Sequence, residues 1–362
     1  MLQASIRCLK SADSLLSESS FRAAAIAADD GLAALPASPP QSLRLALLNV
    51  HGVALHLLGD LVGAHETLSD GLDVALASAR SGTADDDYIG LGGVMTDLAA
   101  NHVRRGDVHN AASLLKRSKY MLARAYRPSD LANACLHVCT GLMHEASGAY
   151  DAALDSQQSA HTLLCTPSLA QATDSFRLAG WTQAARAGSI WAMLRLERTK
   201  AAEVLALADL DPGRMQALGI QEQAFSQSLA SIATLERMQE PSERACDGCV
   251  PSAAHRVAAT RLHAVADALS GILGEEHEEV MVARLNSRRA QHALVGRPDG
   301  GAAEYSTAEQ LEPWTRHWQP ALGAGIAAAL SQPAQRKSPA QQQGGDGSGS
   351  GGSHWRWAHG FS

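Results

Sequence analysis

Two cysteines in the second half of the chain have the spacing of half a zinc site. Cys246 and Cys249 are separated by two residues, and His255 and His263 follow them. A structural zinc ion takes four ligands at characteristic spacing. Because there is no second Cys pair and the spacing to the histidines matches no standard finger, we interpret the two cysteines as incidental residues of an exposed loop. Cys246 and Cys249 are therefore only weak metal candidates, and no metal or other cofactor is predicted.

The fifteen histidines raise the question of acid–base chemistry. His51, His56 and His65 lie close together in the sequence, yet no HExxH pattern is present. His102 and His144 take the same place in successive helix pairs, and we expect them to pack between helices rather than to act as bases. The chain also lacks a Gly-x-Ser-x-Gly nucleophile elbow and a Gly-x4-Gly-Lys-Ser/Thr phosphate loop. The sequence thus predicts a protein that is not an enzyme.

The composition favours closely packed helices. Of the 362 residues, 46% are hydrophobic but only 4% are aromatic, so the core must consist mainly of Ala and Leu. Small side chains let helices approach closely, whereas strands favour β-branched and aromatic residues. The formal charge of −7 gives no basic footprint for nucleic acid. There is no run of about 18 apolar residues, so no membrane span is expected.

The cysteines and the N-terminus bear on the compartment. Six cysteines in a chain of this length do not make a disulfide framework. Cys135 and Cys139 are expected to pack as small hydrophobic side chains in a reducing compartment. Arg7 and Lys10 faintly suggest a transit peptide, but acidic residues such as Asp13 oppose it, and we interpret the segment as part of the fold. The predicted location is the cytoplasm, with the nucleus or an organelle as alternatives.

The elements that position these residues are predicted to be helical hairpins. A tight turn at Gly59-Asp60 divides the stretch Ala46–Leu76 into two short helices. Equivalent turns follow at Gly106, 47 residues later, and at Gly148, 42 residues after that. A helical period in this range indicates a solenoid. The seven predicted hairpins are 5–38, Ala46–Leu76, Gly92–Arg124, Leu131–Leu164, Thr173–Asp211, Met215–Gln239 paired with Ala253–Leu273, and a last one that starts after Leu273 and runs to Leu311.

The chain is predicted to consist of two parts, a helical array and a tail. Residues 1–331 are predicted to form the helical array, with a loop insertion at 240–252. Residues 332–362 are rich in Gln, Pro, Gly and Ser, which predicts a disordered tail, because such a segment buries too little apolar surface to offset the entropy of ordering. The segment His354–Trp357 near its end is interpreted as inert rather than as a partner-binding motif.

Small residues recur at fixed distances from the turns. In the second hairpin, Gly52, Ala64 and Gly71 are expected to let the two helices pack closely, and in the fourth hairpin Gly141 takes the place of Gly52. This pattern, Gly-Asp-x-x-x-Ala with a small residue upstream, resembles the tetratricopeptide repeat. It is carried best by the first four units, in the second by Gly52, Gly59, Leu61, Ala64 and Gly71, and in the fourth by Gly141, Gly148, Tyr150, Ala153 and Ala160.

One segment indicates which type of tetratricopeptide repeat the chain resembles most. Leu273–Val280, followed by Leu285-Asn286, is similar to the inter-repeat segment of kinesin-light-chain-type arrays, whose units are about 42 residues. The family usually has proline where this chain has Glu278 and a second asparagine where it has Ser287. The resemblance implies an all-α, right-handed superhelix whose first helices line a concave groove. No heptad segment for joining a motor heavy chain is present, which argues against a true motor subunit.

The groove of such an array is expected to bind a peptide or helix of a partner protein. Asparagine is useful there because its amide both donates and accepts hydrogen bonds. A receptor for chaperone C-termini is not predicted, since no second basic residue joins Arg104 to hold a carboxylate. Aligning the units predicts these partner-binding residues: Asn49, Val53, His56, Thr96, Asp97, Ala100, Arg104, Val138, Leu142, Glu145, Asn286 and Arg289.

The sequence thus predicts a non-catalytic adaptor or scaffold that binds another protein. Three alternatives remain open. The chain can be an obligate subunit of a larger assembly, such as the repeat partner of a chromosome-associated loader. It can be an organellar assembly factor, if the N-terminus is cleaved, or, least favoured, an enzyme. The partner and the oligomeric state are not given by the sequence.

Overall fold

The computed structural model of the chain describes residues 2–17, 20–81, 87–125, 130–167, 169, 175–216, 223, 226–227, 229–234, 253–275 and 278–295, and the regular structure in these ranges is helical. The all-α prediction is confirmed for these ranges, which contain no strand. Within them, no helix combines the length and apolar character needed to cross a bilayer. The helices are α1 (Leu2–Ser17), α2 (Phe21–Ala33), α3 (Gln41–Leu57), α4 (Leu61–Ser81), α5 (Asp87–Arg104), α6 (Val108–Arg124), α7 (Asp130–Ala146), α8 (Tyr150–Leu164), α10 (Ser175–Arg195), α11 (Thr199–Ala208), α12 (Pro212–Gln216), α14 (Ala253–Leu273) and α15 (Glu278–Val295).

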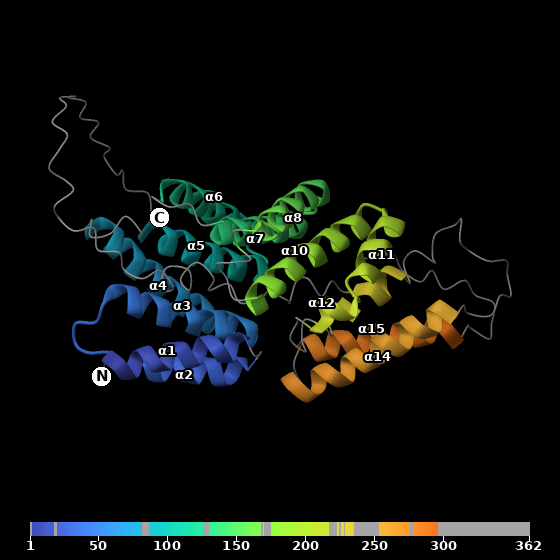
Figure 1. The fold of residues 1–362 in the computed structure, drawn as a ribbon, viewed down its shortest axis with the longest axis horizontal. Coiled ribbons are helices and arrows are strands. Elements are labelled where there is room, and N and C mark those ends of the chain that lie inside the picture. Colours follow the sequence, from blue (N-terminus) through green and yellow to red (C-terminus); the bar gives the residue numbers. More distant parts are fainter. Residues whose placement is uncertain are drawn as a thin grey trace, which may run out of the picture.

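Most helices pair with the next one along the chain. Helices α1 and α2, α3 and α4, α5 and α6, α7 and α8, and α10 and α11 pack as hairpins, and α14 packs on α15. The second helix of each of the first four hairpins also packs on the first helix of the next, and the first helices contact one another in a row from α1 through α3, α5 and α7 to α10. In Figure 1 the hairpins follow one another in an arc, from α1 and α2 at the lower left to α14 and α15 at the right.

The hairpin turns share one conformation that glycine favours. Gly59, Gly106 and Gly148 have positive φ angles of 86°, 81° and 76°, in the left-handed region that a side chain disfavours. The amide of the next residue then donates to the carbonyl five residues earlier, as from Asp60 to Leu55 at 3.0 Å. Asp60 also caps the following helix, since its Oδ1 accepts from the Gly63 amide at 2.9 Å. The predicted turns at these three glycines are confirmed.

The turn between α10 and α11 keeps this conformation without a glycine. Glu197 has a φ of 57°, and the Arg198 amide donates to the Met193 carbonyl at 2.8 Å, as in the other turns. We expect Glu197→Gly to stabilise the chain by about 0.5–1 kcal/mol, because glycine removes the left-handed strain at some entropic cost. Urea unfolding followed by circular dichroism measures this gain.

The converse change gives a matched control for that prediction. At Gly148 an added Cβ would meet no atom within 4 Å, so only the positive φ opposes a side chain there. Gly148→Glu should therefore destabilise the chain by a similar amount. If Glu197→Gly lowers the stability, the backbone at residue 197 is not under the strain that its φ angle indicates.

Two of the small residues set the distance between helices. A Cβ on Gly52 would lie 2.6 Å from the Leu68 Cγ of α4, and one on Gly141 would lie 2.5 Å from the Gln157 Nε2 of α8. Close packing at these two glycines, predicted from the sequence, is confirmed. Gly71 differs, because its nearest neighbour would be 3.7 Å away, an ordinary contact. Alanine would therefore fit at Gly71, so the predicted close packing there needs a small residue but not glycine itself.

The last two described helices join through Gly274, which has a φ of 88°. The sequence predicts that α14 pairs with a preceding helix at Met215–Gln239, of which only parts are described. It predicts that α15 pairs with a following helix that ends at Leu311. Residues 296–362, which include the predicted tail, and the loop with Cys246 and Cys249 lie outside the described residues. The grouping of α14 and α15 into separate repeats therefore stays a prediction.

Candidate partner-binding face

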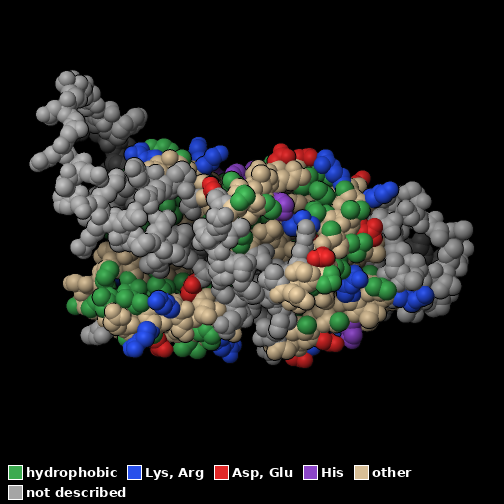
Figure 2. Space-filling view, in the orientation of Figure 1, with side chains coloured by type: hydrophobic (Ala, Val, Ile, Leu, Met, Phe, Trp, Pro, Cys, Tyr) green, Lys and Arg blue, Asp and Glu red, His purple; other side chains and the backbone are tan. Residues whose placement is uncertain are grey.

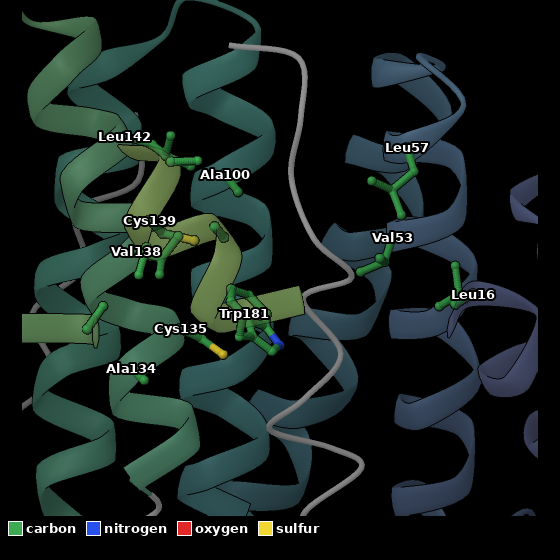
Figure 3. Close-up of a cluster of buried hydrophobic side chains, with 14 of the residues drawn as sticks. Leu16, Val53, Leu57, Ala100, Ala134, Cys135, Val138, Cys139, Leu142 and Trp181 are labelled. Carbon is green, nitrogen blue, oxygen red and sulfur yellow. The ribbon is translucent and has the colours of Figure 1, made fainter. Parts of the chain in front are cut away.

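The predicted partner-binding residues of the first four hairpins belong to the row of first helices. Val53, Ala100, Val138 and Leu142 face a shared interior, where they join one cluster of buried hydrophobic side chains from α1, α3, α5, α7 and α10 (Figure 3). We call this cluster the inner face. Its labelled members are Leu16, Val53, Leu57, Ala100, Ala134, Cys135, Val138, Cys139, Leu142 and Trp181.

The inner face is buried, whereas the sequence placed these residues on an open groove. Val53 is 2% exposed, Ala100 0% and Leu142 8%. Glu145, at the end of the row, is also buried. A contact between these side chains and a partner therefore stays a prediction, and it requires that the buried side chains become accessible.

Asn49 and Asp97 meet between α3 and α5. The Asn49 Nδ2 donates to the Asp97 Oδ2 at 2.5 Å, and both side chains are buried. Burial raises the pKa of Asp97 to about 7, although the bond from Asn49 opposes this change. The other oxygens of the pair, Asn49 Oδ1 and Asp97 Oδ1, have no hydrogen-bond partner among the described residues. If Asp97 is protonated, its Oδ1 can donate a hydrogen bond to the Asn49 Oδ1. The pair therefore suits a neutral Asp97 carboxyl group.

His56 and Arg104 also come together, at the end of α3. The Arg104 Nη1 donates to the His56 carbonyl oxygen, one of the last carbonyls of α3 that have no partner within the helix. Asn101 Nδ2 donates to the Leu61 carbonyl at 3.1 Å and lies 3.5 Å from the His56 Nδ1. Burial, and then the charge of Arg104, lower the pKa of His56 to about 3. His56 is therefore neutral near pH 7 and joins α3 to α5 rather than accepting protons.

Thr96 links α5 to α6. Its Oγ1 donates to the Gly92 carbonyl at 3.0 Å and lies 2.8 Å from the Ser118 Oγ. The Ser118 hydroxyl donates to the same Gly92 carbonyl at 2.7 Å. The polar residues that the sequence assigned to ligand binding in the second and third hairpins thus form hydrogen bonds between neighbouring helices.

The remaining predicted residues lie in α15, away from the α3–α5 contacts. Asn286 is fully buried, and neither of its amide atoms has a hydrogen-bond partner among the described residues. Arg289 is in α15, but its side chain lies outside the described residues. Asn286 therefore forms no hydrogen bond with the predicted residues of the earlier hairpins in the part of the chain that the structure describes.

Among the described residues, His102, Cys135 and Cys139 behave as packing residues. His102 lies beside His65, with ring centroids 5.1 Å apart, and its Nδ1 is 3.0 Å from the Asp107 Oδ2. Cys135 and Cys139 are buried free thiols, as predicted, and burial raises the pKa of both well above the usual value. Among the described residues no group of His, Cys, Asp and Glu side chains suits a metal ion.

Two structural residues were missed from the sequence. Trp181 is 2% exposed and lies on the inner face. Gln157 is wedged between Gly141 and Gly188, and its Nε2 donates to the Val138 carbonyl at 3.3 Å. A signal existed for Gln157, because it stands 16 residues after Gly141, as Leu68 does after Gly52. No equivalent position in the other hairpins indicated that Trp181 would be buried.

Comparison with known proteins gives no relative from which a site can be transferred. No protein-family model matches the chain, and no curated protein matches it.

Proposed function

We propose that the chain is a non-catalytic scaffold that binds another protein, built as a tetratricopeptide-type solenoid of helical hairpins. The observation that supports it best is the order of packing. The five first helices α1, α3, α5, α7 and α10 contact one another in a row, and each of the first four hairpins packs on its successor. Such a row presents a continuous surface whose chemistry is set by side chains from several repeats.

The character of the inner face supports binding rather than catalysis. It is apolar, with Val, Leu, Ala, Cys and Trp side chains from five helices (Figure 3). The predicted polar residues of α3 and α5 hydrogen-bond to one another, as in the pairs Asn49–Asp97 and Arg104–His56. Once it is accessible, a surface of this kind suits the hydrophobic anchors of a partner peptide or helix. The free buried thiols fit a reducing compartment, and we propose the cytoplasm.

Photo-crosslinking with photo-leucine tests this function, because the analogue replaces leucine with little change in volume. The chain is labelled in its native cell, irradiated and purified, and the crosslinked residues are identified by mass spectrometry. We expect crosslinks between a partner and the inner-face residues Leu16, Leu57 and Leu142. The exposed Leu207 of α11, which is 44% exposed, serves as the control position outside this face.

The two parts of the proposal fail in different ways. Partner crosslinks confined to exposed leucines such as Leu207 would refute the inner face as the binding site and leave the scaffold function standing. Recovery of the chain without any specific partner would refute the scaffold function itself.

A further inference from the structure

The outer side of α6 carries four cations and no anion. Lys116, Lys119 and Arg124 are exposed and Arg117 is half-buried, and none of the four belongs to the buried stripe of the helix. The helix contains no Asp or Glu. Figure 2 shows Lys and Arg side chains gathered at the upper edge of the molecule, over α6. We call these four residues the α6 basic face.

The α6 basic face has no carboxylate partner within the described ranges. None of its four residues forms an ion pair with a described carboxylate, whereas three arginines elsewhere do. Like charges three or four residues apart destabilise a helix, so this face favours binding of an external anion. The pairs formed elsewhere are Arg186–Asp209, Arg198–Asp151 at 3.6 Å and Arg284–Glu275 at 2.9 Å.

Aromatic rings hold one of the four cations in place. The Arg124 guanidinium lies 5.6 Å from the centroid of the Tyr88 ring and 5.5 Å from that of the Tyr120 ring. Its Nη1 also donates to the Tyr120 hydroxyl at 2.8 Å. An arginine that is already oriented loses less side-chain entropy when it binds a carboxylate with two parallel hydrogen bonds. Tyr120 is 57% exposed, so its ring is open to a ligand beside the charge.

We propose that the α6 basic face docks a short acidic peptide segment of a partner protein, whose carboxylates contact Lys116, Lys119 and Arg124. Lys116 and Arg124 are eight residues apart, or about 12 Å along the helix. An extended peptide of about four residues has this length. The proposal rests on the proposed function only in that the chain binds proteins, and it does not depend on the inner face.

The charge of the whole chain favours a peptide over a nucleic acid. The formal net charge is −7, which repels a long polyanion. Four cations on one helix also cover little of a phosphate backbone, whose affinity grows with the number of phosphates contacted. A short peptide with a few carboxylates matches the local charge without approaching the rest of the acidic surface.

Fluorescence anisotropy with the full chain and a labelled peptide of four glutamates tests the proposal. We expect the wild-type chain to bind this peptide, and K116E/K119E to weaken the affinity by about tenfold or more. Raising the salt concentration should also weaken wild-type binding, because salt screens exposed charges. The matched control is K10E/R22E, which makes the same change in net charge at exposed positions of α1 and α2 and should stay within about twofold of wild type.

Three outcomes would overturn the proposal: no binding by the wild-type chain, equal weakening by the two double variants, and tighter binding of a single-stranded oligonucleotide than of the peptide. Photo-crosslinking from the inner-face leucines reports on the proposed function independently of all three.

Discussion

Asp97→Asn is expected to stabilise the chain at pH 8 by as much as about 4 kcal/mol. The pKa of Asp97 rises from 3.8 to about 7 in the folded chain, and 1.36 kcal/mol corresponds to each pKa unit. The folded state therefore binds more protons than the unfolded state between these values, and the contribution of Asp97 to stability falls as the pH rises through this window. Asparagine is neutral at every pH and offers an amide donor to the Asn49 Oδ1, which has no described partner.

The pH dependence must be read as a difference between variant and wild type, because His56 acts in the opposite direction. Its pKa falls from 6.5 to about 3, so the folded state binds fewer protons than the unfolded state in this range and stability rises with pH. In the wild-type chain, the contributions of Asp97 and His56 to the pH dependence of stability are opposite in sign and nearly equal. Urea unfolding of both proteins from pH 4 to pH 8 should show that the advantage of Asp97→Asn grows with pH up to about pH 7.

A control separates this effect from the loss of an ordinary surface charge. Asp73 is exposed on α4, and Asp73→Asn should change stability by less than about 0.5 kcal/mol at any of these pH values. If the difference between Asp97→Asn and wild type does not depend on pH, Asp97 is ionised in the folded chain, and the neutral pairing with Asn49 is incorrect.

Trp181→Ala is expected to destabilise the chain by about 3–5 kcal/mol, the range found when a buried aromatic side chain is truncated. Trp181 is one of the largest fully buried side chains, and in Figure 3 it lies beside Cys135 on the inner face. Its removal leaves a cavity where several first helices meet. Urea unfolding followed by circular dichroism measures the loss.

Val62→Ala provides the comparison, because Val62 is 62% exposed on α4 and its truncation should cost little. Trp181→Phe should lose less than Trp181→Ala, since the smaller ring still fills part of the space. A loss for Trp181→Ala no larger than that for Val62→Ala would mean that the inner face is not packed around this ring.

The features that could be predicted from the sequence are those that depend on residues close together in the chain. The turns at Gly59, Gly106 and Gly148 depend on a left-handed backbone and on capping within a few residues, so their signal is local. The close approach at Gly52 also follows from spacing within one hairpin. Glu197 shows the limit of this reasoning, because the hydrogen bonds around it impose the turn without the glycine that usually marks it.

The burial of the candidate site could not be predicted in the same way. Helical spacing places Val53, Ala100 and Val138 on one side of the first helices, but their exposure depends on contacts between distant parts of the chain. The partners of Asn49 and Arg104 lie 48 residues away in each case. Such pairings require the relative position of two hairpins, which a repeat pattern within each hairpin does not contain.

The position of Gln157 between Gly141 and Gly188 limits how this protein can be rearranged. Repeat arrays are commonly shortened or extended by exchange of whole units, and this requires that each unit end on an interchangeable surface. Here one side chain of α8 occupies the space left by glycines in its own hairpin and in α10. A graft or deletion at this junction must carry the three residues together, so the boundary between α8 and α10 is a poor site for modular recombination.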